Sequence, residues 1–271
     1  MRPAVADNPR ERLSGFAAVP AVAAGRAEPI IDRHPLLLIT CEHAGKRVPA
    51  EYRALFDGHD ALLNTHRGWD PGALTLAREI AAEFDAPLFF SETTRLLIDL
   101  NRSIGNPDLY SEFTRPLPVA ARREIVGRHY RPHHEPIEAW FSTAIAEGRR
   151  VVHVASHSFT PELNGQVRTA DIGWLYDPGR PAEVEFSNRW LAAVRDLQPA
   201  LRLRRNYPYI GKSDGLTYRL RRRYAADVYA GIELEVNQRF VQRGGRPWPK
   251  LRRTLIESLQ SALAASPFDP G

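Results

Sequence analysis

The stretch Leu36-Leu37-Leu38-Ile39-Thr40, followed almost at once by the polar residues Glu42 and His43, decides the fold class of this chain. A short, unbroken apolar run that ends in polar residues is typical of a strand buried on both faces. Similar apolar runs predict further strands at 88–90, 96–100, 151–154 and 228–234. We therefore expect a sheet whose two faces are covered by helices.

Helical patterns alternate with these strands along the chain. Asp70 is a candidate N-cap and Pro71 suits the first helical position, so a helix is predicted from there to Phe84. Further helices are predicted at 118–148, with a break at Pro132 or Pro136, and at 182–197, 216–224 and 250–265. The alternation predicts a three-layer α/β fold in which a mixed, largely parallel sheet lies between helices.

The composition is that of an ordinary globular protein. Of the 271 residues, 43% are hydrophobic and 25% are charged, and no apolar run reaches the roughly 18 residues that span a membrane. No internal repeat or linker interrupts the pattern, so we expect a flexible arm over 1–30 and one domain over 31–271. The apolar run 16–24 is too short and too interrupted for a signal peptide. We therefore expect a cytoplasmic protein without a membrane partner.

The charge balance leaves two kinds of anionic partner open. A formal net charge of +5 suits either a small acidic substrate or a nucleic acid. The basic run at 219–223 is accompanied by no aromatic stacking platform and no RNA-binding signature, so a nucleic-acid-binding protein is only a remote alternative. The oligomeric state stays open.

Polar side chains recur where the predicted strands end. Ligands of open α/β sheets bind beyond the carboxyl ends of the strands, so these side chains are expected to share one site. The residues in question are Glu42 and His43, Asn101 and Arg102, Ser156 and His157, and Glu233.

Two of these residues suggest a metal centre. Cys41 is the single cysteine, so any metal must be held by His, Asp or Glu. Two imidazoles and one carboxylate, with a fourth position open, form a standard catalytic zinc shell. We predict His43 and His157 as ligands and Asp70 as the third, with Glu42 and His66 in reserve.

The remaining polar residues suggest hydrolytic chemistry at that metal. A carboxylate on a buried strand is costly unless it is used, so Glu233 is predicted as the general base, and Glu235 lies on the same face of its strand. Arg102 and Asn101 suit recognition of a substrate carboxylate, and Arg95 suits polarisation of a carbonyl. His134 is predicted to face the substrate. No G-x-S-x-G motif is present, which argues against a serine hydrolase.

Six segments in this order resemble N-formylglutamate amidohydrolases. They are Thr-Cys-Glu-His-Ala-Gly (40–45), Gly-Trp-Asp-Pro-Gly-Ala (68–73), Arg-Leu-Leu-Ile-Asp-Leu-Asn-Arg (95–102), Tyr-Arg-Pro-His-His (130–134), Ser-His-Ser-Phe (156–159) and Gly-Ile-Glu-Leu-Glu (231–235). The resemblance spans about residues 35–240, and the family is distantly related to zinc carboxypeptidases and aspartoacylase. It implies a zinc-carboxypeptidase-like (phosphorylase/hydrolase-like) fold.

The resemblance also implies an activity and assigns the residues to it. It implies zinc-dependent hydrolysis of an N-acyl amide, such as that of N-formyl-L-glutamate, with His43 and His157 on zinc and Glu233 as general base. Asn101-Arg102 matches the pair that holds the substrate's α-carboxylate in the carboxypeptidase-like relatives. Two features depart from the wider pattern: the first strand lacks His-x-x-Glu, and Glu235 stands where carboxypeptidases show arginine. Another N-acyl amino-acid deacylase or a small carboxypeptidase is the alternative.

Overall fold

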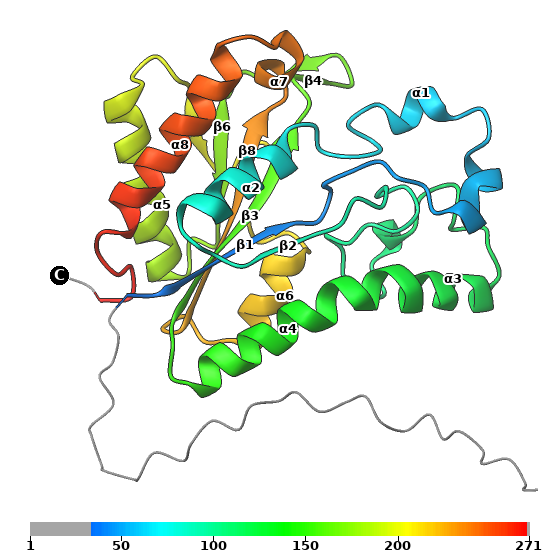
Figure 1. Cartoon of the computed structure of the whole chain (residues 1–271), viewed down its shortest axis with the longest axis horizontal. Helices are drawn as coiled ribbons and strands as arrows, with labels where there is room; N and C mark the ends of the chain where they lie inside the picture. Colours follow the sequence, from blue (N-terminus) through cyan, green and yellow to red (C-terminus); the bar gives the residue numbers. More distant parts are fainter. Residues whose placement is uncertain (1–33, 270–271) are drawn as a thin grey trace, which may run out of the picture. The chain divides into compact units, whose positions relative to one another are not determined.

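A six-stranded sheet forms the centre of the fold in the computed structural model, which describes residues 34–269 (Figure 1). Its strand order is β2-β1-β3-β8-β6-β7. The first four of these run parallel, β6 is antiparallel to β8, and β7 is parallel to β6. The strands are β1 (Leu36–Cys41), β2 (Leu88–Phe90), β3 (Val151–Phe159), β6 (Ile172–Leu175), β7 (Leu203–Arg205) and β8 (Tyr229–Asn237).

Helices cover both faces of this sheet, as predicted. The helices α2 (Ala73–Glu83), α5 (Pro181–Leu197) and α8 (Pro247–Leu263) pack with one face in the largest apolar cluster. The helices α4 (Arg131–Ala146) and α6 (Leu216–Arg223) cover the other face. The three-layer, largely parallel α/β prediction is therefore confirmed.

A second apolar cluster lies beside the sheet and is built mainly from short elements. It contains buried residues of 56–63 and 96–130, among them Phe56, Leu97 and Ile125. The elements of this region are η1 (Ala50–Phe56), α1 (Asp60–Leu63), η2 (Pro107–Leu109), α3 (Val119–Ile125) and the π-helical turn η3 (Val126–Tyr130). Elsewhere lie the small hairpin β4 (Glu162–Leu163) with β5 (Gln166–Val167), and α7 (Arg239–Arg243).

One predicted strand is wrong. The apolar run 96–100 forms turns rather than a strand, although Leu97 and Ile98 are fully buried. Its backbone is satisfied locally, for example by the Asp99 amide donating to the Leu109 carbonyl at 2.9 Å. A short buried run carries no period that distinguishes a strand from other buried backbone, and here the second apolar cluster, not the sheet, buries it.

Several details of the predicted elements also differ from the structure. The helix expected from Asp70 begins at Ala73, after Gly72 turns the chain with a φ of 84°. The break expected at Pro132 or Pro136 is absent, since Pro132 lies in the first turn of α4 and Pro136 is accommodated inside it. The strand β3 runs on to Phe159, so Ser156 and His157 lie within it rather than beyond its end.

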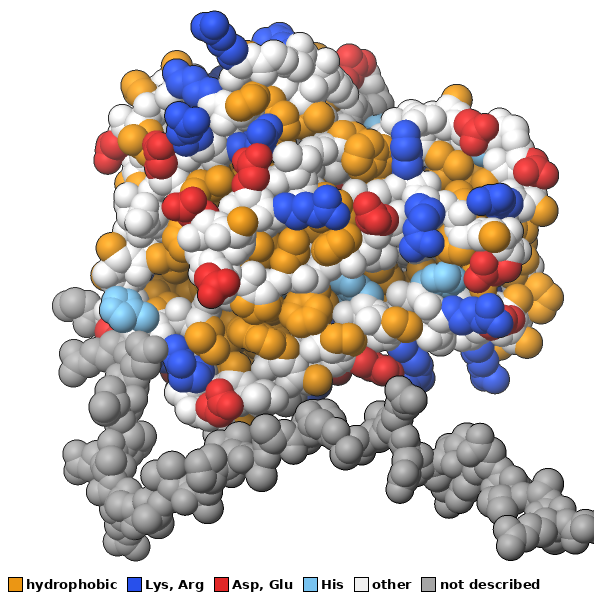
Figure 2. Space-filling view, in the orientation of Figure 1, with side chains coloured by type: hydrophobic (Ala, Val, Ile, Leu, Met, Phe, Trp, Pro, Cys, Tyr) orange, Lys and Arg blue, Asp and Glu red, His pale blue; other side chains and the backbone are white. Residues whose placement is uncertain are grey.

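Parts of the sequence predictions fall outside this description. The predicted arm 1–30 lies outside the described residues. Among residues 34–269, no helix is both long and apolar enough to span a membrane. On the face of the molecule seen in Figure 2, acidic and basic side chains are interspersed and no continuous basic stripe forms.

Candidate metal centre

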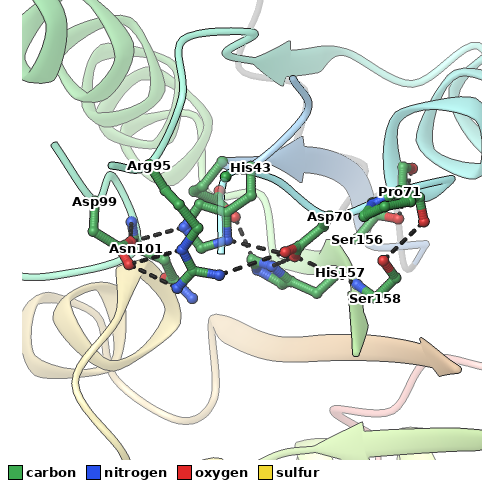
Figure 3. A network of polar contacts seen from close by, with 12 residues as sticks. His43, Asp70, Pro71, Arg95, Asp99, Asn101, Ser156, His157 and Ser158 are labelled. Atoms are coloured by element: carbon green, nitrogen blue, oxygen red, sulfur yellow. Dashed lines mark hydrogen bonds and ion pairs between the residues drawn. The ribbon is translucent and has the colours of Figure 1, made fainter. Parts of the chain in front are cut away.

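His43, Asp70 and His157 converge into one buried group of potential metal ligands (Figure 3). Each offers one ligand atom, and these atoms lie within 4.8 Å of one another. The Nδ1 atom of His157 lies 3.0 Å from Oδ2 of Asp70, and Nδ1 of His43 lies 3.4 Å from the same oxygen. Two imidazoles and a carboxylate are the donor set that zinc accepts.

Three separate segments bring these side chains together. His43 follows β1, and its carbonyl accepts a hydrogen bond from the Asp70 amide at 3.0 Å. Ser156 and Ser158 of β3 bind the turn before α2, donating to the carbonyls of Ala73 and Pro71 at 3.0 and 2.8 Å. Because this turn is held against β3, the Asp70 side chain reaches His157 instead of capping the helix, for which it makes no hydrogen bond.

Gly72 is required in this turn for a steric reason. Its positive φ is rarely adopted by residues with a side chain. A Cβ atom there would also lie only 2.5 Å from the Val241 side chain of α7. The glycine therefore lets the turn pass close to α7 while Asp70 points into the site.

The other ring nitrogen of each histidine faces a second buried carboxylate. Nε2 of His43 lies 2.7 Å from Oδ1 of Asp99, and Nε2 of His157 lies 3.0 Å from Oε2 of Glu42. Carboxylates in such positions fix the orientation of metal-binding imidazoles and raise their basicity. This arrangement leaves Nδ1 of both histidines turned toward Asp70.

The electrostatics of this group suit a cation. Burial alone would raise the pKa of Asp70, but His43, His157 and Arg95 outweigh it and hold that pKa below its usual range. Burial would lower the pKa of His157, yet Asp70 and Glu42 raise it well above its ordinary value. Nδ1 of His43 is buried and makes no hydrogen bond among the described residues. The residues present therefore fit a divalent metal ion.

A cavity of about 180 Å³ opens on this group. His43, Asp70 and His157 line it, and so do four further predicted site residues: Arg95, Asn101, Arg102 and Glu233. The exposed side chains of Tyr209 and Ile210 contribute to its wall. One cavity thus contains seven of the eight predicted site residues.

Glu233 and Glu235 enter the cavity side by side from β8. Their registers opposite Ala155 and His157 of β3 put both on the sheet face that carries His157. Oε1 of Glu233 accepts a hydrogen bond from Thr217 of α6 at 2.6 Å. Glu235 is 5% exposed, and burial is the main cause that raises its pKa to about 7.

Asn101 and Arg102 are held by their backbone surroundings. The Asn101 amide donates to Oδ1 of Asp99 at 2.9 Å, and its side-chain oxygen accepts from the Leu216 amide at 2.7 Å. Nη1 of Arg102 donates to the carbonyls of Asn101 and Asp214 at 2.9 and 3.0 Å. The rest of the guanidinium group remains available to a ligand, since neither its Nε nor its Nη2 makes a hydrogen bond or ion pair among the described residues.

Gly215 lies close to both Asn101 and Glu233, which line the cavity. A Cβ atom at this position would lie 2.7 Å from Oδ1 of Asn101 and 3.3 Å from Oε1 of Glu233. The missing side chain therefore allows the start of α6 to pack against both residues.

Arg95 bridges two of the buried carboxylates. Its Nη2 donates to Asp99 at 2.7 Å and its Nη1 to Asp70 at 3.4 Å, as Figure 3 shows. Burial opposes the charge, but Asp99 and Asp70 raise the pKa of the guanidinium above its ordinary value. Arg95 therefore contributes a permanent positive charge to the cavity wall.

Three other candidate residues, His134, His66 and Glu42, lie outside the ligand group, each in a different place. His134 does not line the cavity; its Nδ1 accepts from Arg219 at 3.0 Å and its ring packs on Tyr130. Burial and the nearby Arg219 lower the pKa of His134 to about 2. Of the reserve ligands, His66 lines the cavity but lies outside the ligand group, and Glu42 faces the far side of His157.

Sequence reasoning missed the roles of two carboxylates. It named Glu42 only as a reserve ligand and did not connect Asp99 with a histidine, whereas each contacts the outer nitrogen (Nε2) of a histidine. The one sequence signal for a role of Asp99 in the site is its position two residues before Asn101, a predicted site residue. Nothing in the spacing of Glu42 indicates which histidine it meets.

Comparison with known protein families gives one match. The sequence profile of a family described as N-formylglutamate amidohydrolase matches residues 36–241. No curated protein matches the chain.

Two solved structures resemble the chain over most of its length. A gene product from Agrobacterium tumefaciens is 29% identical, with a TM-score of 0.73, over 85% of this chain and 91% of that one. An N-formylglutamate amidohydrolase from Ralstonia eutropha JMP134 is 18% identical, with a TM-score of 0.62, over 85% of this chain and 93% of that one. The latter likeness is one of fold.

Proposed function

The chain belongs to the N-formylglutamate amidohydrolase family, and from this premise we propose that it is a zinc-dependent enzyme that hydrolyses an N-acyl amino acid such as N-formyl-L-glutamate. One observation carries the proposal: the buried group His43, Asp70 and His157 opens on a cavity that Glu233 and Arg102 also line. These are the parts that metal-assisted amide hydrolysis needs. The site of action is the cytoplasm.

The metal would be held by His43, Asp70 and His157. A zinc ion bound there supplies Lewis acidity to the scissile carbonyl and lowers the pKa of a water molecule to about 7. Glu233 is positioned on the same cavity wall, and Thr217 holds one of its oxygens at 2.6 Å so that the other is free to accept a proton.

Glu233 handles the proton during the reaction. It accepts the proton of the attacking water as the oxygen adds to the acyl carbon, and it returns that proton to the amide nitrogen as the C–N bond breaks. The products are the free amino acid and the acid of the acyl group, formate for a formyl substrate. Arg95 supplies positive charge where the oxyanion develops.

Arg102 and Asn101 bind the carboxylate of the amino acid. The guanidinium group can clamp a carboxylate through two parallel hydrogen bonds, and the neighbouring Asn101 lines the same cavity. His134 has no part in this proposal, because it lies outside the cavity lining.

The experiment compares two glutamates of one strand. Zinc-loaded Glu233→Gln should lose at least about 100-fold in kcat on N-formyl-L-glutamate, the usual contribution of a general base. Glu235→Gln is the matched variant, since it removes the neighbouring carboxylate from the same strand face. If Glu235→Gln were inactive and Glu233→Gln active, the general base would be Glu235.

Metal and substrate are tested in the same assay. Chelation should abolish activity and zinc should restore it; a protein that binds no divalent metal and gains no activity from one would refute the proposal. Rates on N-formyl, N-acetyl and dipeptide substrates define the reaction. A preference for dipeptides would make the protein a small carboxypeptidase instead.

A further inference from the structure

Glu42 is a buried carboxylate that lies outside the cavity just described. Its side chain is completely buried, and neither oxygen accepts a hydrogen bond of good geometry among the described residues. Oε2 lies 3.0 Å from Nε2 of His157, and Oε1 lies 3.9 Å from Nε2 of His133 on α4. A carboxylate so placed is costly unless its neighbours compensate the charge.

The ring of His157 spans two carboxylates. Nδ1 faces Asp70 at 3.0 Å, and Nε2 faces Glu42 at the same distance. An imidazole that binds a metal through one nitrogen carries its proton on the other, and a carboxylate at the second nitrogen selects that form. Glu42 is therefore on the correct side of the ring to orient His157, and on the wrong side to be the third ligand.

His133 is the second neighbour of Glu42 and comes from a different layer. It lies on α4, is 7% exposed, and its Nε2 has no hydrogen-bond partner within residues 34–269. The ring packs edge-on to His134 at 5.1 Å, which Arg219 in turn binds. The helix covering this face of the sheet thus places an imidazole nitrogen opposite the Glu42 oxygen that does not face His157.

We infer that Glu42 is a positioning residue for the metal centre: it holds the Nε2–H group of His157 so that Nδ1 faces the ion, and His133 holds Glu42 in turn. The inference rests on the metal site of the proposed function. It assigns Glu42 and His133 to a chain of contacts that runs from α4 through the end of β1 to β3.

The expected effect is on metal affinity. Loss of a carboxylate or similar partner behind a metal-binding histidine typically weakens metal binding by about 10- to 100-fold. Glu42→Gln should therefore raise the zinc dissociation constant at least about 10-fold. His133→Asn should raise it less, because Glu42 remains in contact with His157.

The experiment measures zinc dissociation constants by competition with a chromogenic chelator, on the full chain. It uses wild type, Glu42→Gln, His133→Asn and the double variant, after thermal unfolding of each metal-free protein has shown that it folds. Asp214→Asn is the control: this carboxylate, unlike Glu42, lines the cavity, and its partners are Ser103 and Asn106, not a histidine. Its zinc affinity should stay within about twofold of wild type.

The double variant decides whether the contacts form one chain. If His133 acts through Glu42, the His133→Asn change should have no further effect in the Glu42→Gln background. Additive effects would overturn that part of the inference. If Glu42→Gln does not fold, the zinc dissociation constant of His133→Asn alone tests the inference. A value equal to that of wild type would then overturn the inference.

The failure of this inference can be told apart from that of the proposed function. Wild-type protein that binds no zinc contradicts the proposed function. Wild type and Glu42→Gln that bind zinc equally tightly contradict only the role of Glu42.

Discussion

At the scale of single residues, the site depends on which nitrogen or oxygen atom of each side chain contacts which neighbour. Asp99 receives Nε2 of His43 on one oxygen and the Arg95 guanidinium on the other. Burial would raise the pKa of Asp99, but Arg95 and His43 hold it well below its usual range. The carboxylate therefore stays ionised and keeps Arg95 and His43 in fixed positions on the cavity wall.

Arg102 offers a prediction at this scale. Arg102→Lys keeps the charge but removes the planar fork that matches a carboxylate, so KM for N-formyl-L-glutamate should rise at least about 10-fold while kcat changes little. Steady-state kinetics measure this split.

The control substrate is the α-amide of N-formyl-glutamate, which lacks the α-carboxylate. Both enzymes should hydrolyse it with similar kcat/KM. An equal loss on both substrates would show that Arg102 acts on the structure of the cavity rather than on the carboxylate.

At the scale of elements, three parallel strands are tied together below the site by one histidine. His153 of β3 contacts Thr40 of β1 through Nε2 at 2.9 Å and the Tyr229 hydroxyl of β8 through Nδ1 at 3.0 Å. Residues 153, 155 and 157 alternate with their neighbours, so His153 shares the sheet face of His157. The strand that carries the proposed ligand His157 is thus anchored to both neighbouring strands four residues before it.

His153 makes the stability of the fold sensitive to acid. Burial, mainly, lowers its pKa to about 4 from an ordinary value of 6.5. As pH falls below 6.5 the unfolded chain takes up a proton that the folded protein refuses, so stability is lost down to the folded pKa. Between about pH 7.5 and about pH 4.5 this amounts to about 2.5 kcal/mol.

Comparison with His153→Gln isolates this contribution. Glutamine does not titrate, so the stability gap between wild type and variant should narrow by about 2.5 kcal/mol over that pH range. Denaturant unfolding of both metal-free proteins measures it. A gap that stays constant with pH would show that His153 is not the group responsible.

At the scale of the whole molecule, the proposed metal ligands come from segments that are far apart in the chain. His43, Asp70 and His157 come from the end of β1, the turn before α2, and β3. Only the folded chain can bind an ion through all three residues, because the unfolded chain does not hold these side chains together. Metal binding should therefore stabilise the fold as a unit.

Zinc should raise the unfolding temperature measurably. At a free concentration 100 times the dissociation constant it adds about 2.7 kcal/mol, which for a domain of this size is a shift of about 5–10 °C. Calorimetry with and without chelator measures the shift. His43→Gln should abolish it; a variant that kept the full shift would place the ion elsewhere.

The sequence alone determined the layers of the fold and most of the candidate site. Apolar runs and helical periodicity depend on local burial, so they identified β1, β3 and β8 and the helices that cover them. The rule that ligands bind at strand ends then singled out five residues that line one cavity: His43, Asn101, Arg102, His157 and Glu233. His134 does not line this cavity, since its direction depends on how α4 packs.

Only the tertiary structure decided which side chain meets which atom. The apolar run 96–100 is compatible with a strand and with the buried turns that it forms. The second apolar cluster buries it, and this depends on packing between segments far apart in the chain. In the same way, Asp70 faces the inner nitrogen of His157 and Glu42 the outer one because β1, β3 and the turn before α2 approach from different sides. Spacing along the chain contains no information on that choice, because contacts across 87 and 115 residues are set by how whole elements pack.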